Sequence, residues 1–270
     1  MIARNAKFFL LAAMAAFVSD IQAATGPGAD ANSSMIKIPA GEFVMGSSAE
    51  EVQSIKAQYG KREMYKNHPF DEEVPRRKVF VKTFLIDIHE VTNKEYSDFV
   101  HATGHVAPKS WPGGHPDSSK DSFPVTYVTH EDAEAYAKWA DKRLPTAEEW
   151  EKAARGPDGR VYPWGDSFDP YKAATADSDL HAVSAGQCAV GSVAKVMIAP
   201  GDISPYGVRD MAGNVREWTA TAPPGDPKMA LIKGASWVDL SVNARAAHRE
   251  YIPKASSAHI IGFRCVKDAE

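Results

Sequence analysis

The segment FPVTYVTHEDAEAYAKWADKRLPTAEEWEKAAR, residues 123–155, carries the strongest local folding signals of the chain. Thr129 is followed three residues later by Asp132, and Thr146 is followed in the same way by Glu149. In a capping box, the threonine side chain accepts a hydrogen bond from the third helical amide while the acidic side chain bonds back to the threonine amide. The spacing therefore predicts that one helix begins after Thr129 and another after Thr146.

The same spacing recurs upstream in VFVKTFLIDIHEVTN, residues 79–93, which begins as a strand and ends at Thr92. Glu95 lies at the box position, and Gly104 is placed to end the helix that follows. We therefore expect three short helices with related starts, each packing an aromatic side against the core.

The composition is that of a globular protein with many turns. The chain has 270 residues, of which 19 are glycine and 18 are proline, and this content favours short elements joined by loops. The formal net charge is −4, and no cluster of five or more basic residues occurs. Nucleic acid is therefore not an expected partner.

Other elements are expected to be short. Residues 35–47 predict a strand, a tight turn and a second strand, and further strands are expected at 230–237 and 259–266. Residues 49–75 are charged and polar, so we expect a surface insertion there, with one short helix at 49–59.

The N-terminus has the pattern of a signal peptide, predicted at residues 1–23. Basic residues precede the apolar run FFLLAAMAAFV at 8–18, which is shorter than the roughly 20 residues that span a bilayer. A flexible leader at 24–34 and a folded domain at 35–268 are expected to follow. The mature protein is thus expected to be periplasmic or secreted, without a stable membrane span; an uncleaved anchor is the alternative.

Export affects the interpretation of the two cysteines, Cys188 and Cys265. In an oxidising compartment a structural disulfide between them is expected. The alternative is a pair of thiolates that binds a metal or takes part in catalysis.

Several segments together resemble the formylglycine-generating enzyme family, also called the sulfatase-modifying factor family. They include IPAGEFVMGS (38–47), FLIDIHEVTNKEYSDFV (84–100), YPWGD (162–166), YGVRDMAGNVREWT (206–219), GASW (234–237) and IGFRC (261–265), besides the segment quoted first. They occur in the family's order over nearly the whole mature chain. The resemblance implies a single α+β domain, rich in loops, with little regular secondary structure and related to C-type lectin-like folds.

The catalytic residues of that family are missing from GASWVDLSVNARAAHR, residues 234–249. Catalytic members place two cysteines in this stretch, which bind copper(I) and drive oxidation of a substrate cysteine to formylglycine. The first position matches Asp239, and the second falls within 242–244, where no cysteine occurs. A carboxylate is a hard ligand and does not replace a thiolate for copper(I). We therefore expect neither copper nor formylglycine formation, as in the cysteine-free members linked to pyoverdine maturation.

The same stretch still offers polar and aromatic side chains. The candidate catalytic residues are Ser236, Trp237, Asp239, Arg245 and His248. A helical spacing would place Arg245 and His248 on one side, where they could clamp a carboxylate or phosphate group. The alternative is a structural network of ion pairs, with Asp239 or Glu250 as the acidic partner.

The resemblance also implies a calcium site in DMAGNVREW, residues 210–218. The predicted ligands are the side chains of Asp210 and Glu217 and the backbone carbonyls of Gly213 and Val215, since hard oxygen ligands suit calcium. Calcium would have a structural role. The alternative is a turn without a metal, and nothing in the histidine spacing identifies an iron site.

Two functions remain open. The first is a periplasmic enzyme for oxidative tailoring or maturation of an unknown small molecule or peptide. The second is a non-catalytic module, either for ligand binding or as an accessory protein, on a calcium-braced scaffold. The sequence does not decide whether the chain is an enzyme.

Overall fold

The computed structural model describes residues 34–178 and 192–269. The expected signal peptide, most of the leader and Cys188 lie outside these residues. Within them, no helix is both long and apolar enough to cross a membrane.

Four α-helices begin with the hydrogen bonds of a capping box. They are α1 (Ala49–Tyr59), α2 (Asn93–Thr103), α3 (His130–Trp139) and α4 (Ala147–Arg155). The three predicted boxes at Thr92, Thr129 and Thr146 are confirmed, and Gly104 ends α2 in the left-handed conformation. Short 3-10 turns, η1 (Glu63–Tyr65), η2 (Phe70–Glu73), η3 (Pro112–Gly114) and η4 (Ser118–Lys120), lie in the connecting segments.

The strands form three small sheets. One has the order β1-β4-β9, from β1 (Met35–Ile38), β4 (Phe84–Asp87) and β9 (Val266–Asp268); a second pairs β2 (Gly41–Met45) with β3 (Arg77–Val81). The third has the order β7-β6-β5-β8, from β7 (Arg249–Pro253), β6 (Met229–Lys233), β5 (Arg216–Trp218) and β8 (Ile261–Gly262).

The two strands expected within residues 35–47 are confirmed as β1 and β2, which pair with β4 and β3 respectively. Another expectation about strands needs correction. The strand expected at 230–237 ends at Lys233, because Gly234 turns the chain with a φ of +74°. A side chain at Gly234 would also lie 3.2 Å from the Trp150 ring.

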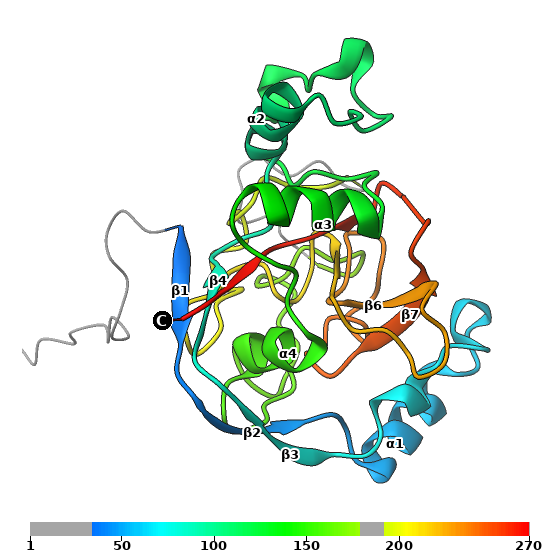
Figure 1. Cartoon of the computed structure of the whole chain (residues 1–270). Coiled ribbons are helices and arrows are strands. Elements are labelled where there is room, and N and C mark those ends of the chain that lie inside the picture. The colour runs from blue at the N-terminus through cyan, green and yellow to red at the C-terminus, as the bar shows by residue number, and fades with distance from the viewer. Residues whose placement is uncertain (1–33, 179–191, 270) are drawn as a thin grey trace, which may run out of the picture.

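Figure 1 shows α2 and α1 toward opposite ends of the molecule, with α3, α4 and the sheets between them. Tyr96, Phe99 and Tyr136 from α2 and α3 pack with Phe263 in one core cluster. Trp150 of α4 lies in a second cluster with residues of β2, β4 and β6. The mixed, loop-rich architecture confirms the expected fold class.

Candidate functional site

The loop after β6 begins with a closed turn that joins Ser236 to Asp239. Both the amide and the hydroxyl of Ser236 donate to Asp239 Oδ2, at 2.8 and 2.6 Å, and the Asp239 amide donates to the Ser236 carbonyl. Ser236 is fully buried and Asp239 is 4% exposed. The turn therefore fixes the Asp239 carboxylate in the interior.

Arg216 of β5 neutralises this carboxylate. Its Nε and Nη2 donate to the two oxygens of Asp239 at 2.8 and 2.5 Å, and its Nη1 donates to Glu250 Oε2 at 3.0 Å. Burial alone would raise the pKa of Asp239, but the bonds from Arg216 and Ser236 hold this pKa below its ordinary value. The position of the first catalytic cysteine thus carries an ionised carboxylate in a closed ion pair.

Arg245 and His248 lie beside a different carboxylate. Arg245 donates from both terminal nitrogens to Glu73 at 2.6 Å, and His248 Nδ1 lies 4.0 Å from Glu73 Oε1. The expected helical arrangement is wrong, since residues 241–247 form turns rather than a helix. The contacts match the alternative of a buried ion-pair network, although its acidic partner is Glu73 rather than Asp239 or Glu250.

Glu73 belongs to a segment that covers the loop. We call residues 60–73, which follow α1 and contain η1 and η2, the cover. Tyr65 and Phe70 of the cover pack in one hydrophobic cluster with Val242, and Leu240 packs against the same cluster. The expectation of a mere surface insertion at 49–75 is therefore wrong: the cover places apolar side chains and a buried carboxylate over the positions of the missing cysteines.

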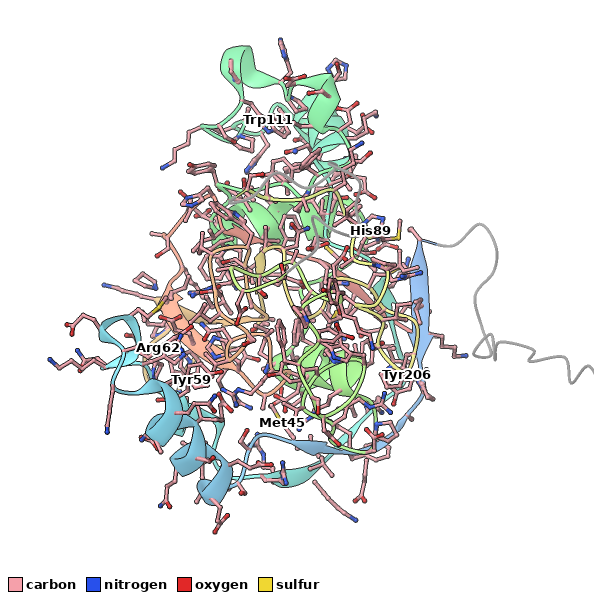
Figure 2. The ribbon with its side chains drawn as sticks, turned by 180° about the vertical axis from the view of Figure 1, so that it is seen from behind. Met45, Tyr59, Arg62, His89, Trp111 and Tyr206 are labelled. Atoms are coloured by element: carbon pink, nitrogen blue, oxygen red, sulfur yellow. The ribbon has the colours of Figure 1, made fainter. Side chains whose placement is uncertain are left out.

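Arg245 lines a cavity of about 210 Å³ beside α1. Trp237 lines a second cavity, away from the cover. This cavity has a volume of about 370 Å³. Its walls include Asn93, Trp111, Phe123, Pro124, Tyr127, Trp237 and His259. Trp237 and His259 have ring centroids 5.5 Å apart, and Tyr127 lies 6.1 Å from His259. Figure 2 shows Trp111 and Arg62, which lies in the cover, toward opposite ends of the molecule.

Polar groups accompany the aromatic rings of the cavity. The indole Nε1 of Trp237 is buried and has no hydrogen-bond partner among the described residues. Lys109 Nζ lies 5.0 Å from the centre of the Tyr127 ring. Tyr127 adopts a φ of +61°, which is uncommon for a residue other than glycine and is often found at functional sites.

Sequence reasoning did not assign Tyr127, Trp111 or His259 to a site with Trp237. These side chains come from segments far apart in the chain and have no common spacing. The aromatic content of FPVTYV was the one available signal, and it was attributed to the family pattern alone.

The predicted calcium ligands are only partly available. Glu217 Oε1 and Oε2 both accept from Arg264 at 2.7 Å, and Oε2 also accepts from Trp150 Nε1 at 2.8 Å. One carboxylate oxygen of Asp210 accepts from the Met197 amide. The carboxylate of Glu217 is therefore engaged with Arg264 and Trp150, and that of Asp210 with Met197.

Two other carboxylates near Asp210 each keep a buried oxygen without a hydrogen-bond partner, Glu90 Oε2 and Asp202 Oδ1. Burial and the nearby charge of Asp210 raise the pKa of Asp202 to about 8. Within the described ranges, no three Asp, Glu, His or Cys side chains are grouped to hold a metal ion. Calcium at this segment stays a prediction.

Cys265 is buried, and burial raises the pKa of its thiol well above the ordinary value. Its expected partner Cys188 lies outside the described residues, so the disulfide also stays a prediction.

Residues 22–269 match the family model described as the sulfatase-modifying factor enzyme 1-like domain. The chain belongs to this family. The inactive C-alpha-formylglycine-generating enzyme 2 of Bos taurus is 32% identical over 285 residues, covering 87% of this chain and 88% of that protein. The formylglycine-generating enzyme of Streptomyces coelicolor is 30% identical over 309 residues, covering 91% and 93%. The resemblance inferred from the motifs is confirmed.

Solved structures show the same fold. PvdO from Pseudomonas aeruginosa superposes with a TM-score of 0.66 at 23% identity, covering 87% of this chain and 94% of PvdO. Treponema denticola variable protein 1 superposes with a TM-score of 0.61 at 16% identity, covering 87% and 95%. At these identities the likeness concerns the fold, so function has to be argued from the site.

Proposed function

We propose that the protein is an exported, non-catalytic member of the family that binds a small molecule or a peptide in the Trp237 cavity. The observation that carries the proposal is the contrast between the two parts of the loop. Asp239 and His248 are at most 4% exposed and lie in an ion pair or a ring contact beneath the cover. Arg245 lines a cavity of about 210 Å³, but its guanidinium is bound to Glu73, whereas Trp237 lines a cavity of about 370 Å³.

The cavity walls suggest the chemistry of the ligand. Its volume of about 370 Å³ lies in the range of small-molecule sites. The rings of Trp237, His259 and Tyr127 favour a planar or apolar group through stacking. We therefore propose a ligand with a planar or apolar group that stacks on these rings.

The arrangement supports binding more strongly than oxidative tailoring. A catalytic group must come within hydrogen-bond reach of its substrate, but Asp239 is bonded to Arg216 and Ser236, and Arg245 is bonded to Glu73. A tailoring reaction at these residues would first need the cover to move. Export itself is proposed from the N-terminal sequence, and periplasmic fractionation tests it.

The experiment is NMR on mature protein labelled with ¹⁵N-tryptophan, which gives one indole signal for each of the 6 tryptophans. A library of planar small molecules and a cysteine-containing sulfatase-motif peptide serve as probes. Compounds that bind should shift the Trp237 indole signal, which Trp237→Phe identifies. Binding should be lost in Trp237→Ala and kept in Trp139→Ala, the matched control, because Trp139 lies on α3 and is 43% exposed.

Two results would refute the proposal. One is a set of binders that Trp237→Ala does not affect, because the ligand site would then lie elsewhere. The other is oxidation of the peptide cysteine with copper(I) and oxygen, followed by mass spectrometry, because the protein would then be a catalyst.

A further inference from the structure

Two histidines join the cover to the loop beneath it. His68 of the cover and His248 of the loop have ring centroids 5.0 Å apart and ring planes at 21° to each other. His68 also contacts the rings of Phe70 at 4.4 Å and Tyr65 at 5.3 Å. The His68 ring therefore packs between the apolar side chains of the cover and the loop that carries Asp239.

One nitrogen of each ring lacks a carboxylate within hydrogen-bond distance among the described residues, although His248 Nδ1 lies 4.0 Å from Glu73 Oε1. His68 Nε2 and His248 Nδ1 are buried without a hydrogen-bond partner in the described part of the chain, and so is Tyr65 Oη. The nearest carboxylate, Glu73, already accepts from Arg245 through both oxygens, and its Oε2 also accepts from the Ser47 hydroxyl.

The charged groups around the pair act in both directions: Glu73 and Asp239 favour a proton on His68, whereas Arg216 and Arg245 oppose it. Asp239 is bonded to Arg216, and the remaining cations that face the rings are Arg245 and Lys233. Burial, with a further effect of Arg216, lowers the pKa of His68 to about 4. Burial, followed by His68 and Arg216, lowers the pKa of His248 well below its ordinary value. Both rings are therefore neutral at pH 7 while the cover is closed.

We propose that the stacked rings of His68 and His248 form an acid-sensitive latch, whose protonation releases the cover and exposes the Asp239–Arg216 pair to solvent. In the released state each imidazole can form hydrogen bonds with water, and the two protonated rings of His68 and His248 move apart. The latch concerns access to the site of the lost cysteines, so it does not depend on ligand binding in the Trp237 cavity.

Proton linkage gives the size of the effect. A histidine whose pKa is about 4 in the closed state and about 6.5 in the open state favours opening by about 30-fold when the pH falls from 7.5 to 5.0. The lowered pKa of His248 in the closed state acts in the same direction. The opening is therefore expected to increase by at least about 30-fold.

Hydrogen–deuterium exchange with mass spectrometry on the mature protein measures this opening. Exchange rates at pH 7.5 and 5.0 are corrected for the intrinsic pH dependence of exchange. The ratio of the corrected rate at pH 5.0 to that at pH 7.5 is then compared between the wild type and the variants. Amides of Tyr65 and His68, which donate to Arg62 and Tyr65 carbonyls, report on the cover. Strand β6 is the internal reference for global opening.

The wild type should show a ratio of at least about 30 in the cover and little change in β6. His68→Phe keeps a ring against Phe70 and Tyr65 but takes up no proton, so its ratio should fall by about 30-fold. His101→Phe, at an exposed position of α2, should keep the wild-type ratio.

Three results would overturn the latch. The first is a ratio near one in the wild type. The second is a ratio in His68→Phe equal to that of the wild type. The third is a rise in β6 that matches the rise in the cover, because opening would then be global unfolding.

Discussion

The buried pair of Glu73 and Arg245 gives a sharp test of whether the cover is part of the folded core. Glu73 receives both terminal nitrogens of Arg245 at 2.6 Å and the Ser47 hydroxyl at 2.7 Å. Their side chains are 0% and 7% exposed. Glu73→Gln keeps the shape but removes the negative charge, and it turns one oxygen into a donor that faces the guanidinium.

Removing one partner of a buried ion pair costs about 3–5 kcal/mol, because the other charge stays buried without compensation. Net stabilities of domains are about 5–15 kcal/mol, so the loss should be plain in urea denaturation followed by tryptophan fluorescence. The double variant Glu73→Gln/Arg245→Met removes both charges and should recover most of the loss. A coupling free energy of at least about 2 kcal/mol is expected from the full cycle.

Asp98→Asn is the matched control, because Asp98 pairs with Lys94 on α2 while both side chains are more than half exposed. It should change the free energy of unfolding by less than about 1 kcal/mol. Two results would refute the assignment of the cover to the core. One is a loss in the free energy of unfolding below about 1 kcal/mol for Glu73→Gln, and the other is an equal loss in the single and the double variant.

Two further predictions concern protons and calcium. Burial alone would raise the pKa of Glu151, but Lys233, Arg249 and Arg155 lower it from 4.5 to about 2. The contribution of ionised Glu151 to the free energy of unfolding is therefore present above pH 4.5 and is lost as the pH falls toward 2. Urea denaturation should therefore show a loss of about 2 kcal/mol in the free energy of unfolding between pH 5 and 3, and Glu151→Gln should remove that loss; an unchanged loss contradicts the assignment. Elemental analysis of protein purified without chelator should find about one calcium per chain, and EGTA should lower the Tm; no calcium and an unchanged Tm would contradict the predicted site.

The helix starts were predictable because their signals are local. Thr92, Thr129 and Thr146 each bond within three residues of themselves, so the information lies in a few adjacent positions. The helix at 49–59 was also predicted with its observed bounds. Its own capping box, from Ser48 to Glu51, lies in the charged stretch that was expected to stay on the surface.

The cover was missed because its inward side chains follow no regular period. Tyr65, Phe70 and Glu73 are buried, while most residues between them are exposed and charged or polar. Their partners come from the other end of the chain: Arg245 is 172 positions from Glu73. No pattern within the segment shows that such a partner exists, so composition alone favoured a surface insertion.

The sequence identified residues of the candidate site, but it did not show which of them lie together. The family was identified from its ordered motifs, and the absence of cysteine at 239 and 242–244 was evident once the family was known. The separation of Trp237 from Asp239 was not evident, because two positions in one turn point to different surroundings. Asp239 accepts from the Ser236 backbone and side chain, whereas Trp237 extends to His259 and the cavity wall.

More than one substitution therefore separates this site from one that could carry out the cysteine chemistry of the family. Returning a cysteine to position 239 would leave Arg216, 16% exposed at its side chain, without its main carboxylate, and Ser236 without its acceptor. The new thiol would take the place of a side chain that is 6% exposed, in a loop whose Leu240 and Val242 pack against Tyr65 and Phe70 of the cover. The ion pair and the cover thus both stabilise the site in a form that the original reaction does not use, which is why we place the function of this chain at Trp237.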